Sequence, residues 1–232
     1  GGHIAGWRVA GDLCAQVDAA MLFLLSGQQC CRGVCRECAP PMLIAVGDGN
    51  HSLATAKACW EKIKPTLSER ERHVHPARYA LAELVNLHDG ALAFEPIHRV
   101  LFDVDPNSVL DALQKQLGAC ADGQGQVFTY AAGGRTGRLV VANPPSPLAA
   151  GTLQGFIDGY LAAHGGTVDY IHGGDVVMEL SKKPGAIGFL LPAMEKSQLF
   201  PAVREGGALP RKTFSMGHAY EKRFYLECRK IQ

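Results

Sequence analysis

The pattern of apolar and polar positions predicts a strand, a turn and a helix in the first third of the chain. Residues 42–46 form a continuous apolar run, which is typical of a buried strand. Residues 47–50 then carry the small and polar side chains of a turn. Apolar side chains recur at helical spacing from Leu53 to Ile63, and Pro65 ends the predicted helix.

The same patterns predict further helices and strands along the chain. Asp105 and Pro106 form a typical helix start, with Asp105 as the N-cap. The pair Gly133-Gly134 predicts the turn of a hairpin, and residues 79–87 fit either a strand or a helix. Helices are predicted at 17–25, 106–117, 148–163 and 197–204, and strands at 4–9, 96–104, 127–131, 138–142, 168–171, 176–180 and 186–191.

The order of these elements predicts the fold class. Helices and strands are interspersed, and the second half contains hairpins, which favours an α+β fold with a mixed sheet over a doubly wound parallel sheet. A break near residues 144–147 divides the chain into an α/β portion, residues 1–145, and an α+β portion, residues 146–232. A single domain is the alternative.

Composition limits the classes of function. The chain has 232 residues, 47% of them hydrophobic, which excludes a disordered chain. Its 23 basic and 22 acidic side chains give a net charge of +1, without an electrostatic footprint for nucleic acid or an anionic membrane. The longest apolar run, residues 19–25, is too short to span a bilayer. We therefore expect a small-molecule substrate, no nucleic acid and no membrane as partner, and these numbers leave the oligomeric state open.

The N-terminal residues bear on the compartment. No basic stretch followed by an apolar run opens the chain, so no secretory signal is visible and a cytoplasmic protein with reduced cysteines is expected. The chain begins Gly1-Gly2-His3 without an initiator Met, directly before a strand-like run. Such an opening is typical of the interior of a protein, so we expect an upstream signal or domain.

The first candidate site is the turn from Asp48 to Ser52. Gly49 lets a ligand approach the backbone, and the helix start offers unpaired N–H groups to a phosphate or a carboxylate. Asp48 could hold Mg²⁺ or act as a base, and His51 could donate to a phosphate oxygen or move a proton. The alternative is that Asp48 or Asn50 only caps the helix.

The second candidate is the basic segment, residues 209–217. Arg211 and Lys212 are adjacent, and with Ser215 and a second nearby hydroxyl they could surround an anion. The alternative is a solvated basic turn, which is what a charge run usually forms.

The third candidate is the pair His98 and Arg99 at the start of a predicted strand. Side chains alternate along a strand, so these two residues are expected to face opposite sides. At most one of them would then enter a given site, and a structural histidine is the alternative for His98.

The fourth candidate is a group of four cysteines, Cys30, Cys31, Cys35 and Cys38. Four thiolates could bind Zn²⁺ in a tetrahedron. Adjacent ligands strain that geometry, and only Cys35 and Cys38 form a C-x-x-C pair. An incidental cysteine-rich loop is the alternative.

Three blocks of the sequence resemble a bacterial family known as domain of unknown function 1015. They are AVGDGNHSLATAKACWEKIK (residues 45–64), PARYALAELVNLHDGALAFEPIHRVLF (residues 76–102) and GALPRKTFSMG (residues 207–217), the last followed by EKRFYLECRKI. The order of the blocks implies that the chain is the C-terminal portion of such a protein. The cysteine group is not part of the family pattern.

The turn of the first block is also similar to the phosphate-binding motif of the ParB and sulfiredoxin-like superfamily, which includes kinases of free serine. This resemblance implies a ParB-like element at the strand, turn and helix, in which Asp48, Gly49, Asn50 and His51 bind the phosphoryl group or its acceptor. The sequence departs from the motif at Ser52, where the superfamily often has Arg. Arg211, Lys212 or Arg99 would then supply the charge.

These observations lead to three hypotheses of different classes. The first is a small-molecule phosphotransferase with Mg²⁺ as a candidate cofactor. Its phosphoryl donor would be ATP, ADP or pyrophosphate, and its acceptor a hydroxyl group such as that of free serine. The second is a non-catalytic module that binds phosphate or another ligand. The third is a zinc or redox protein built on the cysteine group.

Overall fold

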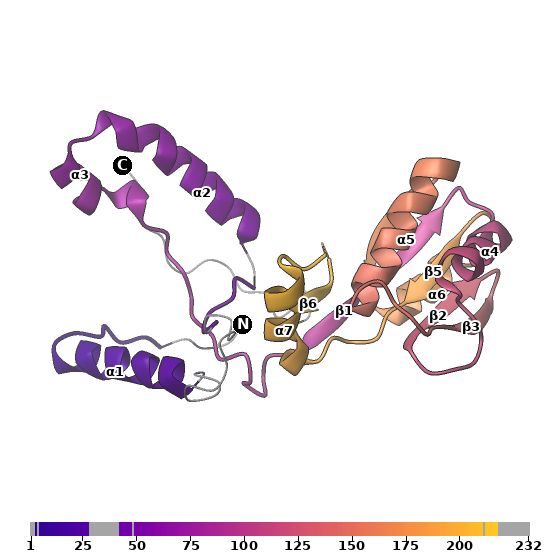
Figure 1. The fold of residues 1–232 in the computed structure, drawn as a ribbon, viewed down its shortest axis with the longest axis horizontal. Coiled ribbons are helices and arrows are strands. Elements are labelled where there is room, and N and C mark those ends of the chain that lie inside the picture. Colours follow the sequence, from indigo (N-terminus) through magenta and orange to yellow (C-terminus); the bar gives the residue numbers. More distant parts are fainter. Residues whose placement is uncertain (1–2, 4, 28–41, 48, 211, 218–232) are drawn as a thin grey trace. The chain divides into compact units, whose positions relative to one another are not determined.

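The computed structural model describes residues 3, 5–27, 42–47, 49–210 and 212–217. Contacts divide the chain between Leu81 and Ala82 into two compact units, which we call the N-terminal unit and the C-terminal unit (Figure 1). Each unit is described by itself.

The N-terminal unit is helical in its described residues. Its elements are α1 (Asp12–Gly27), α2 (Asn50–Ile63), η1 (Lys64–Thr66), α3 (Glu69–Val74) and η2 (Pro76–Arg78). The predicted helix ends where Pro65 enters η1, and Arg72 Nε donates a hydrogen bond of 2.9 Å to the Lys64 carbonyl oxygen, which ties α3 to this end. None of the described residues of this unit is buried.

Two strands predicted for the N-terminal unit are absent from its described residues. Residues 42–46 form no strand, and neither do residues 5–9 of the predicted strand 4–9, while Ile4 lies outside the described residues. A strand exists only where a neighbouring strand pairs with its backbone groups. The described part of this unit supplies no such neighbour, and Ile44 and Val46 are exposed. The helix of the strand–turn–helix prediction is confirmed, and its strand is wrong.

The C-terminal unit is built on a sheet. Its strands are β1 (Phe94–Phe102), β2 (Gln126–Ala132), β3 (Arg135–Val141), β4 (Thr167–His172), β5 (Ile187–Leu190) and β6 (Phe214–Met216). The order is β3-β2-β5-β1-β4, and β6 pairs with the beginning of β1. The α+β class is confirmed, but every strand pair described is antiparallel where a mixed sheet was expected.

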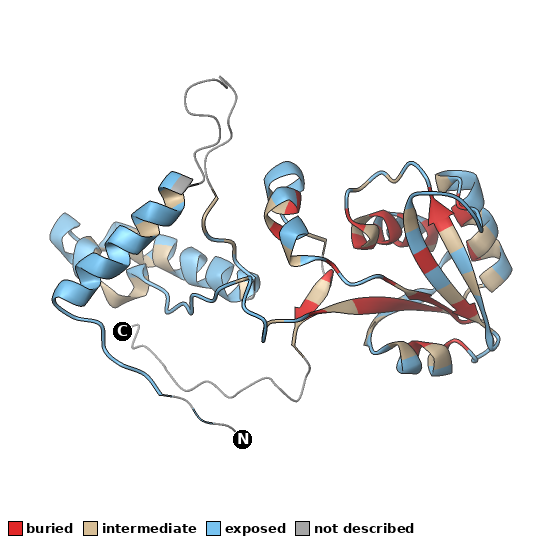
Figure 2. Cartoon of the chain, turned by 90° about the horizontal axis from the view of Figure 1, so that it is seen from below, coloured by how far each residue is buried: buried red, intermediate tan, exposed pale blue. Residues whose placement is uncertain are grey.

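Helices pack on both faces of this sheet (Figure 2). They are α4 (Pro106–Leu117), α5 (Ala149–His164), α6 (Gly174–Leu180) and α7 (Lys196–Gly206). Leu101 and Ile187 point into the main core, which α4 and α5 cover. Their neighbours Val100 and Gly188 pair across β1 and β5, and Gly188 lies against Val177 of α6. Because side chains alternate along a strand, α6 lies on the opposite face.

Helix α6 corrects a prediction, since residues 176–180 were expected to be a strand. Val177 is fully buried while Val176 is 43% exposed, a difference that a helix with one face on the sheet produces as readily as a strand. Gly188 leaves room for this helix: a Cβ there would stand 2.5 Å from Val177 Cγ1. The glycine that admits α6 lies on another element, so the local sequence does not reveal it.

A smaller second core joins α7 and β6 to the beginning of β1. The rings of Phe94 and Phe214 stack with centroids 4.1 Å apart, and Met194, Leu199 and Ala202 are buried around them. Helix α7 confirms the helix predicted at 197–204 and contains Pro201 in its interior.

Helix α4 follows its sequence signals closely. Asp105 caps it by accepting hydrogen bonds from the backbone N–H groups of Asn107 and Ser108, and Gly118 ends it in the left-handed conformation.

Residues 79–87 form neither the strand nor the helix that their pattern fitted. No helix in the described part of the chain has the length and apolar character needed to cross a bilayer.

Candidate functional site

The turn predicted as a site places a glycine immediately before α2. Gly49 has φ 82° and ψ 14°, a left-handed conformation in which a side chain would be strained. Its carbonyl oxygen accepts the N–H of Leu53 at 2.9 Å, the first bond of the helix. Asp48, the residue expected to hold Mg²⁺ or to act as a base, lies outside the described residues.

The first turn of α2 is open to solvent. Asn50, His51 and Ser52 are all exposed, and the N-cap residue, Gly49, makes no side-chain cap. The first N–H groups of a helix have no carbonyl partner within the helix, and they carry its positive dipole end. The structure therefore presents these three residues and their N–H groups together on an accessible helix start.

The basic segment lies in the C-terminal unit. Lys212 is exposed and has a positive φ of 57°, whereas Arg211 lies outside the described residues. Ser215 is 9% exposed in β6, where it pairs with Glu95 of β1. Of the described candidates in this segment, Lys212 offers its charge to solvent and Ser215 is part of the sheet.

His98 is buried inside β1. Its Nδ1 accepts a hydrogen bond of 3.1 Å from the backbone N–H of Leu191. Burial lowers the pKa of His98, and the positive charges of Arg99 and His172 lower it further. The neutral ring with a proton on Nε2 is the form that this contact selects.

Arg99 is completely buried, on the opposite face of β1. Its Nε donates to Gln154 Oε1 of α5 at 3.3 Å, another guanidinium nitrogen donates to the Ile97 carbonyl oxygen, and the guanidinium lies 5.0 Å from the ring centroid of Tyr170. Burial lowers the pKa of Arg99 to about 10, while Tyr170 and Asp158 act in the other direction. The guanidinium therefore stays protonated at neutral pH and joins β1, α5 and β4.

The predicted site residues thus fall into both units. The turn residues belong to the N-terminal unit, and His98, Arg99, Lys212 and Ser215 belong to the C-terminal unit. The expectation that His98 and Arg99 face opposite sides of their strand is met, since Arg99 contacts α5 on the face of the main core.

The possible metal ligands of the sequence are not described. Cys30, Cys31, Cys35 and Cys38 lie outside the described residues, as does Asp48. Within the ranges that the structure describes, no three or more His, Cys, Asp or Glu side chains are placed to hold a metal ion.

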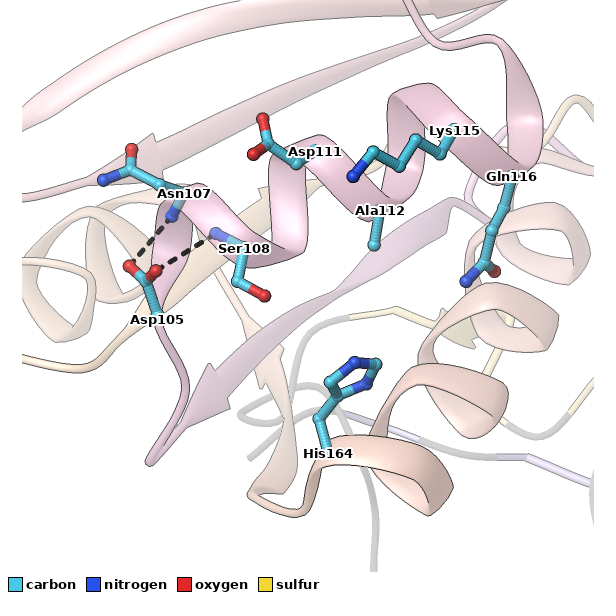
Figure 3. Close-up of a pocket in the computed structure, with 8 residues that line it drawn as sticks. All are labelled: Asp105, Asn107, Ser108, Asp111, Ala112, Lys115, Gln116 and His164. Atoms are coloured by element: carbon cyan, nitrogen blue, oxygen red, sulfur yellow. Dashed lines mark hydrogen bonds between the residues drawn. The ribbon is translucent and has the colours of Figure 1, made fainter.

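The structure adds a polar pocket that the sequence did not indicate. It lies between α4 and the end of α5, has a volume of about 380 Å³, and is shown in Figure 3. Ser108, Ala112 and Gln116 point from α4 toward His164. The residues that line it are Asp105, Asn107, Ser108, Asp111, Ala112, Lys115, Gln116 and His164.

Hydrogen bonds order one wall of this pocket. The Tyr160 hydroxyl donates to Ser108 Oγ at 3.0 Å, and His164 Nδ1 lies 3.0 Å from the Tyr160 carbonyl oxygen. A carbonyl oxygen can only accept, so Nδ1 of His164 carries a proton and donates it to this contact. The signals in the sequence were the helix start at Asp105 and the histidine that ends α5, and neither reveals that these two helices pack together.

Comparison with known proteins gives one result. A family model described as protein of unknown function (DUF1015) matches residues 2–180, and this range includes both the turn at Gly49 and the buried pair His98 and Arg99. Neither the comparison with curated proteins nor the comparison with solved structures finds a match. Because the family model covers most of the chain, the protein belongs to the DUF1015 family.

Proposed function

We propose that the chain supplies the phosphate-binding element of a phosphotransferase that acts on the hydroxyl group of a small molecule such as free serine. The observation that carries this proposal is the start of α2, where exposed Asn50, His51 and Ser52 follow a left-handed glycine. The similarity of residues 48–51 to the turn of ParB and sulfiredoxin-like proteins supports the same function.

The backbone at this helix start suits an anion. The N–H groups of its first turn have no carbonyl partner within the helix, and together with the positive end of the helix dipole they attract a phosphate oxygen. An added Cβ at Gly49 would meet no atom within 4 Å, so the space beside the glycine is open in the described structure. A phosphoryl group can therefore approach the main chain closely.

The three exposed side chains add donors of the right chemistry. The Asn50 amide and the Ser52 hydroxyl can donate to phosphoryl oxygens. The His51 imidazole can donate as well, or it can move a proton between the acceptor hydroxyl and solvent. Phosphoryl transfer depends mainly on such positioning and on neutralising charge.

Asp48, which lies outside the described residues, completes the proposed chemistry. Asp48 supplies a carboxylate, and Mg²⁺ in phosphoryl-transfer sites is commonly held by one or two carboxylates together with phosphate oxygens. When bound, Mg²⁺ neutralises charge on the transferred group. The phosphoryl donor that we propose is ATP, ADP or pyrophosphate.

Calorimetric titration of the full chain with pyrophosphate, ATP and serine tests the proposal. We expect pyrophosphate or ATP to bind, and we expect His51→Ala and Asn50→Ala to weaken that binding by about tenfold each, as the loss of one charge-assisted hydrogen bond implies. His88→Ala is the matched control, because His88 is exposed in a turn of the C-terminal unit. Equal affinity of the His51 variant and the control would refute the role of the turn.

A second candidate is a non-catalytic phosphate-binding module. One observation favours it: the described residues at the start of α2 are all exposed, whereas catalysis usually takes place where water is excluded. A turnover assay separates the two functions. Formation of a phosphorylated hydroxyl product supports the enzyme, and tight binding of pyrophosphate without any product supports the module.

A further inference from the structure

The His98 side chain forms a hydrogen bond with the chain segment that follows β5. His98 is 6% exposed in β1, and its Nδ1 accepts the N–H of Leu191 at 3.1 Å. Leu191 comes directly after the last residue of β5, so its N–H is not part of the described strand pairing between β5 and its neighbours. The His98 side chain thus supplies the hydrogen-bond acceptor that a partner strand would otherwise supply to the Leu191 N–H.

This contact lies where the two cores of the C-terminal unit meet. Leu191 itself packs in the main core under α4 and α5. Three residues later, Met194 packs in the second core with Leu199 and Ala202 of α7. The His98–Leu191 hydrogen bond therefore holds the short connection through which the sheet leads into α7.

Protonation is incompatible with this hydrogen bond. A neutral imidazole that accepts through Nδ1 carries its proton on Nε2. The next proton must bind to Nδ1, the atom that faces the Leu191 N–H. Two donors then point at each other, and the Leu191 N–H loses its acceptor in a buried place.

The surroundings of His98 make its charged form unfavourable while the hydrogen bond to Leu191 is intact, a state that we call closed. Arg99, the next residue of β1, and His172 of β4 are the groups whose positive charge acts on His98, and the segment after β5 presents the Leu191 amide to it. Burial is the largest cause that lowers the pKa of His98, followed by Arg99 and His172. Opening the segment lets water reach His98, which relieves its burial and screens the two positive charges.

We propose that the His98–Leu191 hydrogen bond is an acid-sensitive latch, closed while His98 is neutral and open once His98 is protonated. Opening frees residues 191–194 and loosens the packing of α7 on the second core. That core also contains Leu209 and Phe214, which flank the exposed Lys212, so the latch links pH to the position of the basic segment. This inference is independent of the phosphate-binding proposal for α2.

The sign of the pH dependence follows from the lowered pKa. The open state binds a proton more readily than the closed state, so acid favours opening. Between the pKa of the closed state and the ordinary histidine value of about 6.5, the opening equilibrium rises by up to about tenfold for each pH unit of acidification. Above that range the latch is fully closed.

Hydrogen exchange of the full chain, followed by NMR from about pH 7.5 to about pH 5.5, tests the latch in the range where histidine titrates. After division by the intrinsic exchange rates, the protection of the Leu191 amide should fall by up to about tenfold per pH unit. The amide of Leu113, buried in α4, should keep its protection and serves as the internal control. Constant protection of Leu191 over the whole range would overturn the proposal.

Two variants separate His98 from its neighbour. His98→Asn places an amide oxygen near the position of Nδ1, so it can accept from Leu191 without titrating, and we expect protection that does not change with pH. His172→Gln removes a charge but keeps His98. The fall in protection should therefore persist but level off at a slightly higher pH, because the pKa of His98 in the closed state rises. The same fall in the His98→Asn variant would contradict the latch.

A measurement on the unaltered chain remains decisive if His98→Asn does not fold. The nitrogen chemical shifts of His98 report which ring nitrogen carries the proton. The latch requires a proton on Nε2 at neutral pH and loss of Leu191 protection at the pH where Nδ1 becomes protonated. A neutral ring with its proton on Nδ1 would refute it.

Discussion

The two units of the chain form regular helices equally well but differ in what those helices bury. Helices α1 and α2 have 16 and 14 residues, and α5 has 16. Helix α5 buries seven residues against the sheet, while no described residue of the N-terminal unit is buried. A helix closes its backbone hydrogen bonds within one segment, whereas this core needs a paired sheet that collects side chains from distant parts of the chain.

Leucine-to-alanine substitutions should show the difference between the two units most clearly. Leu153 of α5 is 1% exposed, and Leu153→Ala should cost about 2–5 kcal/mol of unfolding free energy because it leaves a cavity. Leu22 of α1 is 65% exposed, and Leu22→Ala should change the free energy by less than about 0.5 kcal/mol. Urea unfolding of both variants measures the difference, and equal losses would mean that α1 is packed as firmly as α5.

A matched pair of glycines sharpens the account of the C-terminal unit. A Cβ at Gly188 would stand 2.3 Å from Ser181 Oγ and 2.5 Å from Val177 Cγ1, so Gly188→Ala should cost about 1–3 kcal/mol by overpacking. A Cβ at Gly155 on the exposed face of α5 would meet no atom within 4 Å, so Gly155→Ala should stabilise the helix by about 0.5–1 kcal/mol. Thermal unfolding should move the two variants in opposite directions; a stable Gly188→Ala would show that α6 does not lie on the sheet there.

Removal of a helix cap should have a smaller effect, and one that depends on the unit. Asp105→Ala removes the cap of α4, whose Val109 and Leu113 are buried, and should cost about 1 kcal/mol. Ser68→Ala removes the capping box of α3, which has six residues and buries none, so cooperative unfolding should hardly change. Circular dichroism during thermal unfolding compares the two variants. A larger loss of stability from Ser68→Ala than from Asp105→Ala would contradict the expectation that the cap matters more in the C-terminal unit.

The smallest expected effect is a local pH dependence in the N-terminal unit. Hydrogen bonds from the side chain and backbone of Ser68 lower the pKa of Glu71 below its ordinary value of 4.5. The capping box is therefore intact above that value, and its contribution is lost as pH falls through the lowered pKa. Carboxyl carbon shifts of Glu71 measure it; Ser68→Ala should return the pKa toward the ordinary value, and an unchanged pKa would contradict the contact.

Sequence signals predicted the elements whose causes are local. The N-cap Asp105, Pro106 and the C-cap Gly118 lie within or beside α4, and the predicted helix has the observed ends. The strands predicted at 42–46 and within 4–9 failed because a strand depends on a partner that its own residues do not specify. Helix α6 was mistaken for a strand because the glycine that accommodates it, Gly188, lies on β5.

In the candidate sites too, local features were predictable and contacts between distant residues were not. The strand alternation of His98 and Arg99 was predictable, but their partners Leu191 and Gln154 lie 93 and 55 residues away in the sequence. The pocket between α4 and α5 was missed for a similar reason, since it exists only because two separate helices pack side by side. The glycine before α2 was predicted from the turn alone, and its left-handed conformation was found in the structure.

NMR titration of the full chain with pyrophosphate tests the central functional claim most directly. The account predicts that the backbone amides from Gly49 to Leu53 shift and saturate together, while those of β1 and the core face of α5 do not respond, because the anion binds at the exposed start of α2. Unchanged amide signals at the start of α2, or shifts confined to the pocket around His164, would contradict it.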